Sequence, residues 1–426
     1  MNKRAKNKGG KKAASEGQLW LRLPGLVGEA LYETVIGAGL ACVDEALEAE
    51  RAALCGARYL HIADRQALRA GHVASSLVLG GRRVAVSRPR ARSLNGHELK
   101  LPSWREWSAR DPLEHRALEQ MVLGVSTRRY ARSLEPLPKA VAVRGVSKSA
   151  VSERFVYGTE RKLGELMSRE LGRLKLAALM IDGVHFGEHV VLAAVGVDER
   201  GGKHVLGLRE GATENTAAVK ALLADLVERG LDTNHSLLIV IDGAKALHKA
   251  VAEVFGRRAL IQRCREHKKR NVTDALPERS RAAVRSAMNQ AYATRDAGRA
   301  QRLLGNLARR LEHQHPGAAA SLREGLEETL TVMRLELPEN LERVLSSTNL
   351  IENLFSRVRE IGRRVKRWQS GTMVLRWTAA GVLEAERGFR KLAGHRAIPT
   401  LVAALRAHDA QLDRAEGKLD TAQNAA

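Results

Sequence analysis

The middle of the chain is predicted to have an α/β fold. Two apolar runs, residues 176–181 and 237–241, have the length of buried strands, and each is followed by Asp-Gly. Strand-like and helical patterns alternate around these runs, and a strongly periodic helix begins near residue 349. The chain before residue 171 is predicted to be mainly helical, with a small β module.

Composition indicates a nucleic-acid partner. The 426 residues carry a formal net charge of +23, which favours a polyanion, nucleic acid before membrane. Aromatic residues make up only 4%, which argues against single-strand binding on stacked aromatic platforms. No apolar run is long enough to span a bilayer, no secretory signal opens the chain, and three scattered cysteines do not make a disulfide framework. We expect a soluble, cytoplasmic, nucleoid-associated protein that binds double-stranded DNA and no membrane.

The N-terminal part is predicted to contain a basic arm, helices and a β-hairpin. Residues 1–15 carry lysine and arginine but no acid, as expected of an arm that contacts phosphates or of a solubilising tail. Helical patterning then continues to about Arg69. Short apolar runs on either side of Gly80-Gly81 predict the hairpin. Its arginines lack an intervening acid, and we expect two of them, Arg82 and Arg83, to contact DNA.

Residues 113–154 are predicted to form a helix-turn-helix unit. The apolar face of the first helix consists of Leu118, Met121 and Val122. A second helix is expected to open over residues 126–130 and to be closed by Pro136 and Pro138. Helical bundles without DNA contacts share this pattern, and the net charge favours the DNA-binding interpretation.

A further helix is predicted after Ser147, which has the side chain of an N-cap. Lys148 and Ser149 occupy its first turn. Small and polar side chains at this place suit insertion into a major groove, so we expect these two residues to contact DNA.

The elements after the first Asp-Gly pair follow a recognisable order. Two strands, over residues 190–197 and 204–208, are joined by a hairpin. A helix follows, capped by Asn215 or Thr216, and its buried face consists of Val219, Leu222, Leu223 and Leu226. The Asp242 strand, a helix over residues 244–254 and a strand over residues 259–261 come next. Three antiparallel strands followed by helix, strand, helix and strand is the ribonuclease-H-like order.

Two carboxylates are predicted to meet at one edge of this sheet. Asp182 is expected where its strand ends, with Gly183 allowing a turn or the close approach of another group. Asp242 ends the second apolar strand in the same way. The alternative is two ordinary strand-to-turn junctions, because Asp-Gly is a common turn dipeptide.

Cys264 and His267 are two residues apart, a spacing that supplies half of a zinc site. A structural zinc ion takes four ligands, and the chain has no second cysteine pair, so we expect no stoichiometric zinc. We expect a phosphate-binding or structural role for both side chains, with His267 mattering more. Residues 277–345 are helical and polar in pattern, with breaks at Pro316 and Pro338, and predict a helical insertion.

The helix that starts near residue 349 has two different stripes. Its apolar positions are Ile351, Leu354, Phe355, Val358, Ile361 and Val365. Glu352, Arg359 and Arg363 line another stripe, where a carboxylate suits a metal and arginines suit DNA phosphates. The alternative is a solvated face with i,i+4 pairs.

Four short motifs occur in a fixed order: Asp182-Gly183, Asp242-Gly243, Cys264-x-x-His267 and Thr348-Asn349-x-Ile351-Glu352. Together they resemble the bacterial Mutator-type insertion-sequence transposases, and the resemblance covers most of the chain, from about residue 113 to residue 392. It implies a ribonuclease-H-like catalytic domain with an Asp-Asp-Glu triad, which maps onto Asp182, Asp242 and Glu352. It also implies that the Cys-x-x-His element lies near the active site.

This triad suits metal-assisted phosphoryl transfer. Two divalent cations about 3.5–4 Å apart activate the attacking oxygen and stabilise the leaving oxygen. Mg²⁺ takes hard oxygen ligands, so we expect two Mg²⁺ ions, with Mn²⁺ able to substitute. Asp182 is the candidate that bridges both ions, and Asp242 and Glu352 would each complete one site.

The predicted function is a DNA transposase that binds terminal inverted repeats, cleaves strands and joins 3′-hydroxyl ends to target DNA, as a homodimer or larger assembly. Two alternatives remain: a ribonuclease-H-like nuclease or resolvase that stops at hydrolysis, and a non-catalytic DNA-binding regulator.

The predicted organisation has seven segments. They are a basic arm and N-terminal helices (1–75), a small basic β module (76–102), a helix-turn-helix-like DNA-binding region (103–170), the first part of the ribonuclease-H-like domain (171–275), the helical insertion (276–345), the final part of that domain (346–392), and a C-terminal helix and tail (393–426).

Overall fold

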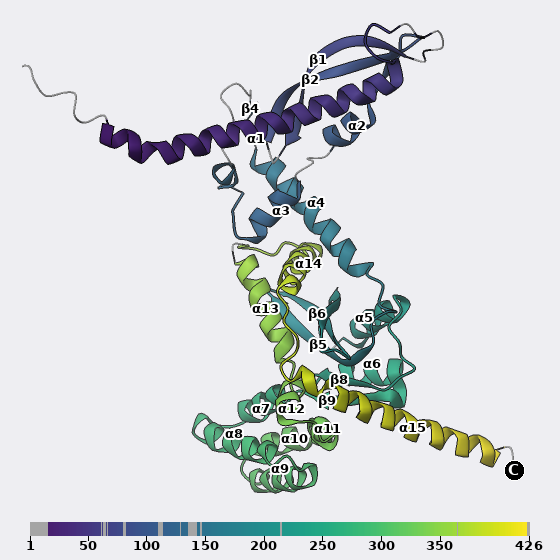
Figure 1. The fold of residues 1–426 in the computed structure, drawn as a ribbon. Helices are drawn as coiled ribbons and strands as arrows, with labels where there is room; N and C mark the ends of the chain where they lie inside the picture. The colour runs from purple at the N-terminus through teal and green to yellow at the C-terminus, as the bar shows by residue number, and fades with distance from the viewer. Residues whose placement is uncertain are drawn as a thin grey trace, which may run out of the picture. The chain divides into compact units, whose positions relative to one another are not determined.

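The chain forms two units, residues 1–158 and residues 159–426, in the computed structural model (Figure 1). The structure describes residues 16–60, 62, 65, 67–79, 82–109, 114–127, 129–134, 143–144, 147–213, 215–363 and 365–423. Within these residues, no helix has both the length and the apolar character needed to cross a bilayer. The seven-segment division stays a prediction.

A twisted hairpin and several helices make up the N-terminal unit. Its elements are α1 (Glu16–Cys55), β1 (Ala67–Leu79), β2 (Arg82–Ser93), β3 (Glu98–Leu99), α2 (Pro102–Ala109), α3 (Glu114–Val122), the 3₁₀ turn η1 (Tyr130–Ser133), β4 (Val143–Arg144) and the first half of α4 (Lys148–Met167). Strands β1 and β2 are antiparallel, with Leu79 opposite Arg82, and β3 and β4 both pair with β2. The predicted hairpin is confirmed, although Gly80 and Gly81 lie outside the described residues.

The helical prediction for the start of the chain runs too far. Helix α1 ends at Cys55, and Arg69 lies in β1. The Arg69 guanidinium donates a hydrogen bond to the Gly56 carbonyl and is paired with Glu48 of α1. These contacts tie the hairpin to the end of α1, a long-range arrangement that local periodicity does not reveal.

The predicted second helix of the helix-turn-helix unit is also wrong. The residues there form η1, in which Arg132 N donates to the Arg129 carbonyl at 3.0 Å, three residues back. The Ser133 hydroxyl donates to the Tyr130 carbonyl at 2.7 Å, so a side chain competes with the backbone for an acceptor that an α-helix would use. Pro136 and Pro138 lie outside the described residues.

The flanking helices agree with the sequence pattern. The apolar face predicted for α3 is buried, at Leu118, Met121 and Val122. Helix α4 starts at Lys148, and the Ser147 hydroxyl accepts a hydrogen bond from Ala150 N at 3.1 Å. The predicted N-cap is therefore confirmed.

A five-stranded mixed sheet organises the C-terminal unit. Its strands are β5 (Leu176–Phe186), β6 (His189–Asp198), β7 (Lys203–Glu210), β8 (Leu237–Ile241) and β9 (Ala259–Arg263), in the order β7-β6-β5-β8-β9. Strands β5, β6 and β7 are antiparallel neighbours, whereas β8 pairs parallel with both β5 and β9. The predicted order of elements is confirmed, and it places the two Asp-bearing strands side by side.

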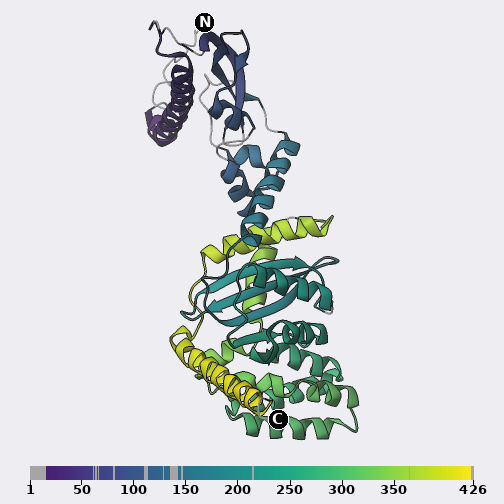
Figure 2. The same ribbon diagram turned by 90° about the vertical axis from the view of Figure 1, so that its right-hand side faces the viewer.

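Helices cover both faces of this sheet (Figure 2). Helices α5 (Thr216–Glu228) and α6 (Lys245–Phe255) pack on one face. Helices α13 (Asn349–Gly362), α14 (Gly371–Arg387) and α15 (Ile398–Gln423) contribute to the core on the other. The predicted buried face of α5 is confirmed, and Asn215 caps this helix by accepting from Ala217 N at 3.0 Å.

Between β9 and α13 lies a run of helices, called the helical segment below. It contains α7 (Arg265–Asp274), α8 (Glu278–Ala293), α9 (Ala297–Leu311), α10 (Pro316–Arg323), the 3₁₀ turn η3 (Glu327–Leu330), α11 (Thr331–Arg334) and α12 (Glu339–Leu345). These helices bury a core of their own. Helix α10 begins at Pro316, one of the two predicted breaks, and a loop separates it from η3.

The helical segment covers the free edge of β9. The buried Gln262 side chain donates to the Thr329 carbonyl at 3.0 Å and accepts from Val332 N at 2.9 Å. The Thr331 hydroxyl donates to the Ile261 carbonyl at 2.6 Å. An edge strand exposes unpaired backbone groups. Here the Thr331 hydroxyl satisfies the Ile261 carbonyl, and the Gln262 side chain joins the strand to η3 and α11.

Replacing Gln262 should loosen this edge. Gln262→Leu removes three side-chain bonds, including one to the Arg263 carbonyl at 2.7 Å, and leaves the buried Val332 N–H without its partner, which costs about 1–3 kcal/mol. Hydrogen exchange should become faster across residues 327–334, together with a lower urea midpoint. Gln290→Leu, at an exposed position on α8, is the control and should change neither. Unchanged exchange in Gln262→Leu would contradict this account of the edge.

Candidate active site

Asp182 and Asp242 occupy equivalent positions on neighbouring strands. The parallel pairing of β5 with β8 ends where Ile181 lies opposite Ile241, and one aspartate follows each of these residues. The expectation that Asp182 ends its strand is wrong, since β5 continues to Phe186 in its pairing with β6. What ends before Asp182 is the pairing with β8, so the two carboxylates still meet at one edge.

Gly183 permits a close approach and not a turn. A Cβ atom at this position would lie 2.7 Å from Thr213 Cγ2. The absent side chain therefore lets the chain between β7 and α5 lie against β5 directly beside Asp182.

Backbone amides fix the direction of both carboxylates. Asp182 Oδ1 accepts from Gly183 N at 2.9 Å, and Asp242 Oδ1 accepts from Ala244 N at 2.8 Å. Asp182 is only 5% exposed. Burial raises the pKa of Asp182 to about 6, with a further rise from Asp242, and the His267 charge and Thr348 hydroxyl only partly oppose this. The site thus holds a desolvated carboxylate beside a second one.

The next strand brings Cys264 and His267 to the same edge. Cys264 N donates to the Ile241 carbonyl at 2.8 Å, and Cys264 is the N-cap of α7. Thr348, just before α13, donates through its backbone N to Cys264 Sγ at 3.4 Å. Its hydroxyl lies 3.5 Å from the same sulfur and 3.4 Å from His267 Nδ1. The start of α13 is therefore bonded to the end of β9.

Cys264 and His267 shift each other's protonation. A hydrogen bond to Cys264 raises the pKa of His267 to about 9, burial opposes the rise, and the charges of Asp182 and Asp242 add to it. Burial works against the Cys264 thiolate, but the hydrogen bond and charge of His267 outweigh it and lower the thiol pKa. A cationic imidazole beside the carboxylates is the result.

Glu352 reaches this cluster through His267. Glu352 lies in the first turn of α13, and its Oε1 is 3.9 Å from His267 Nε2. Its side chain is about half exposed. Among the described residues, no three His, Cys, Asp or Glu side chains are close enough together to form a ready metal site. The three acids converge on one region without sharing a coordination sphere.

A family model described as "Transposase, Mutator family" matches residues 31–389. The chain belongs to the Mutator family of transposases. The resemblance inferred from the four motifs is therefore confirmed.

Curated relatives cover most of this family member. The transposase for insertion sequence element ISRM5 of Rhizobium meliloti is 29% identical over 322 residues, which make up 74% of this chain and 79% of that protein. The transposase for insertion sequence element IS406 of Burkholderia multivorans is 29% identical over 365 residues, 79% of this chain and 88% of that protein. The transposase for insertion sequence element IS6120 of Mycolicibacterium smegmatis is 27% identical over 242 residues, 55% and 72% of the two chains.

In the Mutator-family chain, Arg359 is exposed on α13, and Arg363 is exposed directly after the helix. The opposite side is buried, at Ile351, Leu354, Phe355 and Val358. Ile361 and Val365 are only partly buried. The helix ends at Gly362, so Arg363 and Val365 lie beyond its last turn and not within it.

The other predicted DNA contacts lie in the N-terminal unit and the start of α4. Arg83 is exposed and donates to the Ser76 hydroxyl at 3.2 Å. Arg82 begins β2, and its side chain lies outside the described residues. Lys148 and Ser149 are exposed in the first turn of α4. Accessibility suits all three described side chains to DNA, and their role stays a prediction.

Sequence reasoning overlooked two residues of this family member. The Thr348 hydroxyl does not cap α13 and points instead to Cys264 and His267. Arg263 is buried at the end of β9 and donates to the Gly243 carbonyl at 3.0 Å. No local signal marks Arg263, because its two acceptors lie 20 and 61 residues away in the sequence.

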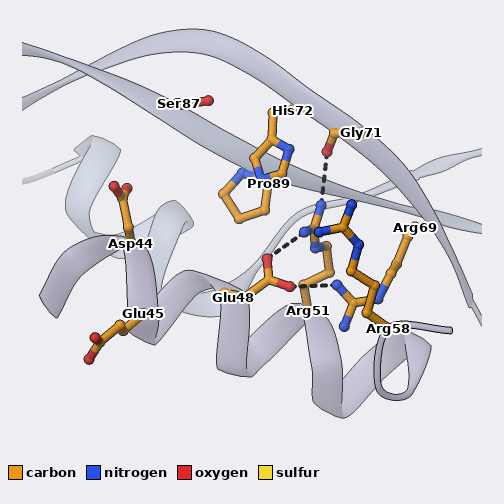
Figure 3. Close-up of a pocket in the computed structure, with 10 residues that line it drawn as sticks. All are labelled: Asp44, Glu45, Glu48, Arg51, Arg58, Arg69, Gly71, His72, Ser87 and Pro89. Carbon is orange, nitrogen blue, oxygen red and sulfur yellow. Dashed lines mark hydrogen bonds and ion pairs between the residues drawn. The ribbon is translucent and has the colours of Figure 1, made fainter. Parts of the chain in front are cut away.

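A cavity of about 740 Å³ in the N-terminal unit is a rival site (Figure 3). Figure 3 shows Glu48 between Arg51 and Arg69, with Arg51 also bonded to the Gly71 carbonyl. These arginines are engaged in joining α1 to β1. Glu48 has a lowered pKa, because both arginines outweigh the effect of burial. The cluster is explained by packing, so it is not the preferred site.

Burial of Asp182 should lower stability at neutral pH. The pKa of Asp182 in the folded protein, about 6, exceeds the ordinary 3.8, so folding favours the protonated carboxyl. The contribution of this protonated group to stability is complete below pH 3.8 and is lost as the pH rises through 6. This difference corresponds to roughly 3 kcal/mol. Asp182→Asn, measured by urea unfolding with EDTA, should therefore gain stability relative to wild type as the pH rises from about 4 to about 7.

Asp198→Asn provides a control of opposite sign. Burial raises the pKa of Asp198, but His204 and the amides of Gly202 and Arg200 outweigh it and lower the value. This variant should lose stability relative to wild type as the pH rises. A pH-independent difference for Asp182→Asn would contradict the assigned burial effect.

Proposed function

We propose that the protein is a DNA transposase that binds the terminal inverted repeats of its element, cleaves DNA strands and joins the 3′-hydroxyl ends to target DNA. Membership of the Mutator family supports this proposal. We propose further that it works as a homodimer or larger assembly on DNA, because two element ends have to be brought together.

The observation that carries the proposal is the register of β5 and β8. It places Asp182 and Asp242 beside each other, each directly after the last pair of parallel strand residues. The order β7-β6-β5-β8-β9, antiparallel and then parallel, supports our assignment of a ribonuclease-H-like catalytic domain. Glu352 on α13 is the proposed third acid, since His267 links it to the same sheet edge.

The donor set fits hard divalent cations. Asp182, Asp242 and Glu352 supply carboxylate oxygens, the ligands that Mg²⁺ prefers, and Mn²⁺ accepts them too. The raised pKa of Asp182 is a second indication, because a desolvated carboxylate is stabilised by a nearby cation. Two bound cations would supply activation of the attacking oxygen and neutralisation of charge on the leaving oxygen.

The protein's own residues orient these groups. Gly183 N and Ala244 N hold one oxygen of each aspartate. His267 offers its Nε2 side to Glu352, while its Nδ1 side faces Thr348. In this proposal His267 places Glu352 or contacts a DNA phosphate, and Cys264 fixes the imidazole.

The two proposed reactions balance without an external energy source. In the first, water attacks phosphorus at the element end, the P–O3′ bond breaks, and a 3′-hydroxyl and a 5′-phosphate remain. In the second, this 3′-hydroxyl attacks a target phosphodiester, a new P–O3′ bond forms, and the target strand leaves with its own 3′-hydroxyl. One phosphodiester is exchanged for another in the second step.

A pre-cut substrate tests the proposal against its alternatives. A duplex with a free 3′-hydroxyl at the element end is incubated with a target plasmid and Mg²⁺. Joined product supports the transposase. Cleavage of an uncut duplex without joining would favour a nuclease or resolvase, and a band shift without chemistry would favour a regulator.

The triad can be tested by nearly isosteric substitutions. Asp182→Asn, Asp242→Asn and Glu352→Gln should each abolish cleavage and joining, because they remove the charges that hold the cations. The band shift with end DNA should be retained. Glu360→Gln, an exposed position on the same helix as Glu352, is the control and should stay active. Full activity in any one of the three variants removes that residue from the triad.

Salt dependence can identify phosphate contacts. Each neutralised phosphate adds about 0.9 to the steepness with which log K falls as log salt rises. Arg359→Ala combined with Arg363→Ala should therefore flatten this slope by roughly two. The loss should be similar on end-containing and scrambled duplexes. Lys148→Ala or Ser149→Ala should instead reduce the preference for end DNA. An unchanged slope would mean that Arg359 and Arg363 lie on an ordinary solvated surface and do not contact phosphates.

A further inference from the structure

Arg263 is a buried charge that contacts the turn over residues 242–244, called the Asp242 turn below. It is the last residue of β9, opposite Ile241, and it is 5% exposed. Its Nη2 donates to the Gly243 carbonyl at 3.0 Å, and its Nη1 donates to the Glu324 carbonyl at 2.8 Å. One guanidinium therefore joins the residue after Asp242 to the loop that follows α10.

Two glycines make room for this guanidinium. A Cβ atom at Gly243 would lie 2.1 Å from Arg263 Nη2, and one at Gly325 would lie 2.4 Å from Arg263 Nη1. Gly325 also has a φ of +58°, a conformation that favours glycine. Any larger residue at Gly243 would displace the guanidinium from its acceptors.

The loop at Glu324, which accepts the other Arg263 hydrogen bond, is itself held by buried contacts. The Lys268 ammonium, almost fully buried, donates to the Ser321 and Glu324 carbonyls. The Glu324 carboxylate lies 3.4 Å from Arg263 Nη2. The loop after α10 thus gives Arg263 a fixed anchor in the helical segment, 61 residues away in the sequence.

The bond from Arg263 to the Gly243 carbonyl influences the direction of the Asp242 carboxylate. The Asp242 carboxylate is oriented by Ala244 N, and Gly243 lies between these two residues. A cavity of about 180 Å³ adjoins the turn, with Asp242, Lys245, His248 and Arg263 among its lining. Without Arg263, this open space would leave the Gly243 carbonyl free to rotate, and the carboxylate with it.

We propose that Arg263 is a positioning residue for Asp242: it anchors the turn over residues 242–244 to the loop at Glu324–Gly325 and so makes the active site depend on the helical segment. The inference rests on the proposed catalytic role of Asp242. Residues that orient metal ligands typically affect metal affinity or activity by about 10–100-fold when replaced.

The contact itself is tested by stability coupling. Gly243→Ala and Arg263→Ala should each lower the melting temperature of the full chain. The double variant should be no less stable than Arg263→Ala alone, because the alanine then meets no guanidinium. Additive losses in the double variant would overturn the proposed contact, whatever the protein's activity.

The positioning role is tested by Mg²⁺ dependence of strand cleavage. Arg263→Ala and Gly243→Ala should cleave about 10–100-fold more slowly and need more Mg²⁺ for half-maximal rate. Arg263→Lys should recover part of the loss, since a lysine can reach one of the two carbonyls. Normal rates and Mg²⁺ dependence in the first two variants would overturn the role.

Arg229→Met is the matched control. The Arg229 side chain is 10% exposed, and it bonds to Asp225 and to the Leu206 carbonyl but not to the Asp242 turn. This variant should lose stability while keeping the wild-type Mg²⁺ dependence, and a shift like that of Arg263→Ala would count against a specific role. If Asp242→Asn kept full activity, the proposed function would fail while the stability coupling still held, so the two failures are distinguishable.

Discussion

The C-terminal unit depends on the buried polar residues at the end of β9 and the start of α7. Residues 262–268 are polar or charged, yet most of them are buried, so each needs a partner in the interior. The partners come from three places. Gln262 and Lys268 bond to the helical segment, Arg263 bonds to both that segment and the Asp242 turn, and Cys264 bonds to β8 and to Thr348. One short stretch therefore holds together the strand edge, the helical segment and the helix that carries Glu352.

The helical segment is consequently more than a spacer between Asp242 and Glu352. The buried ion pair between Arg265 and Glu342, 2.9 Å apart, joins the start of α7 to α12, immediately before the approach to α13. Arg265 N also donates to the Ser346 carbonyl at 2.9 Å. Breaking a buried pair leaves an uncompensated charge, which costs about 3–5 kcal/mol, so this connection is stiff. The position of α13 is set from the same strand end that sets Cys264 and His267.

The sequence was a good guide where local pattern decides structure. The buried face of α5, its Asn215 cap and the pairing of two Asp-bearing strands follow from apolar spacing and capping chemistry. It failed where distant partners decide. Asp182 lies inside β5 because β6 continues the pairing, and η1 replaces a helix because Ser133 captures the Tyr130 carbonyl. Arg263 was passed over because its two acceptors lie 20 and 61 residues away.

The same physics explains why the site is costly to the fold. A carboxylate as buried as Asp182 is unfavourable unless a cation or hydrogen bonds compensate, and beside Asp242 it is more so. His267 supplies part of the compensation, since Cys264 and both aspartates favour its cationic form. Glu352 stays half exposed at 3.9 Å from that imidazole. Two acids are thus held rigidly by backbone amides, whereas the third is held by a single longer contact, and this asymmetry leaves Glu352 as the acid with freedom to adjust.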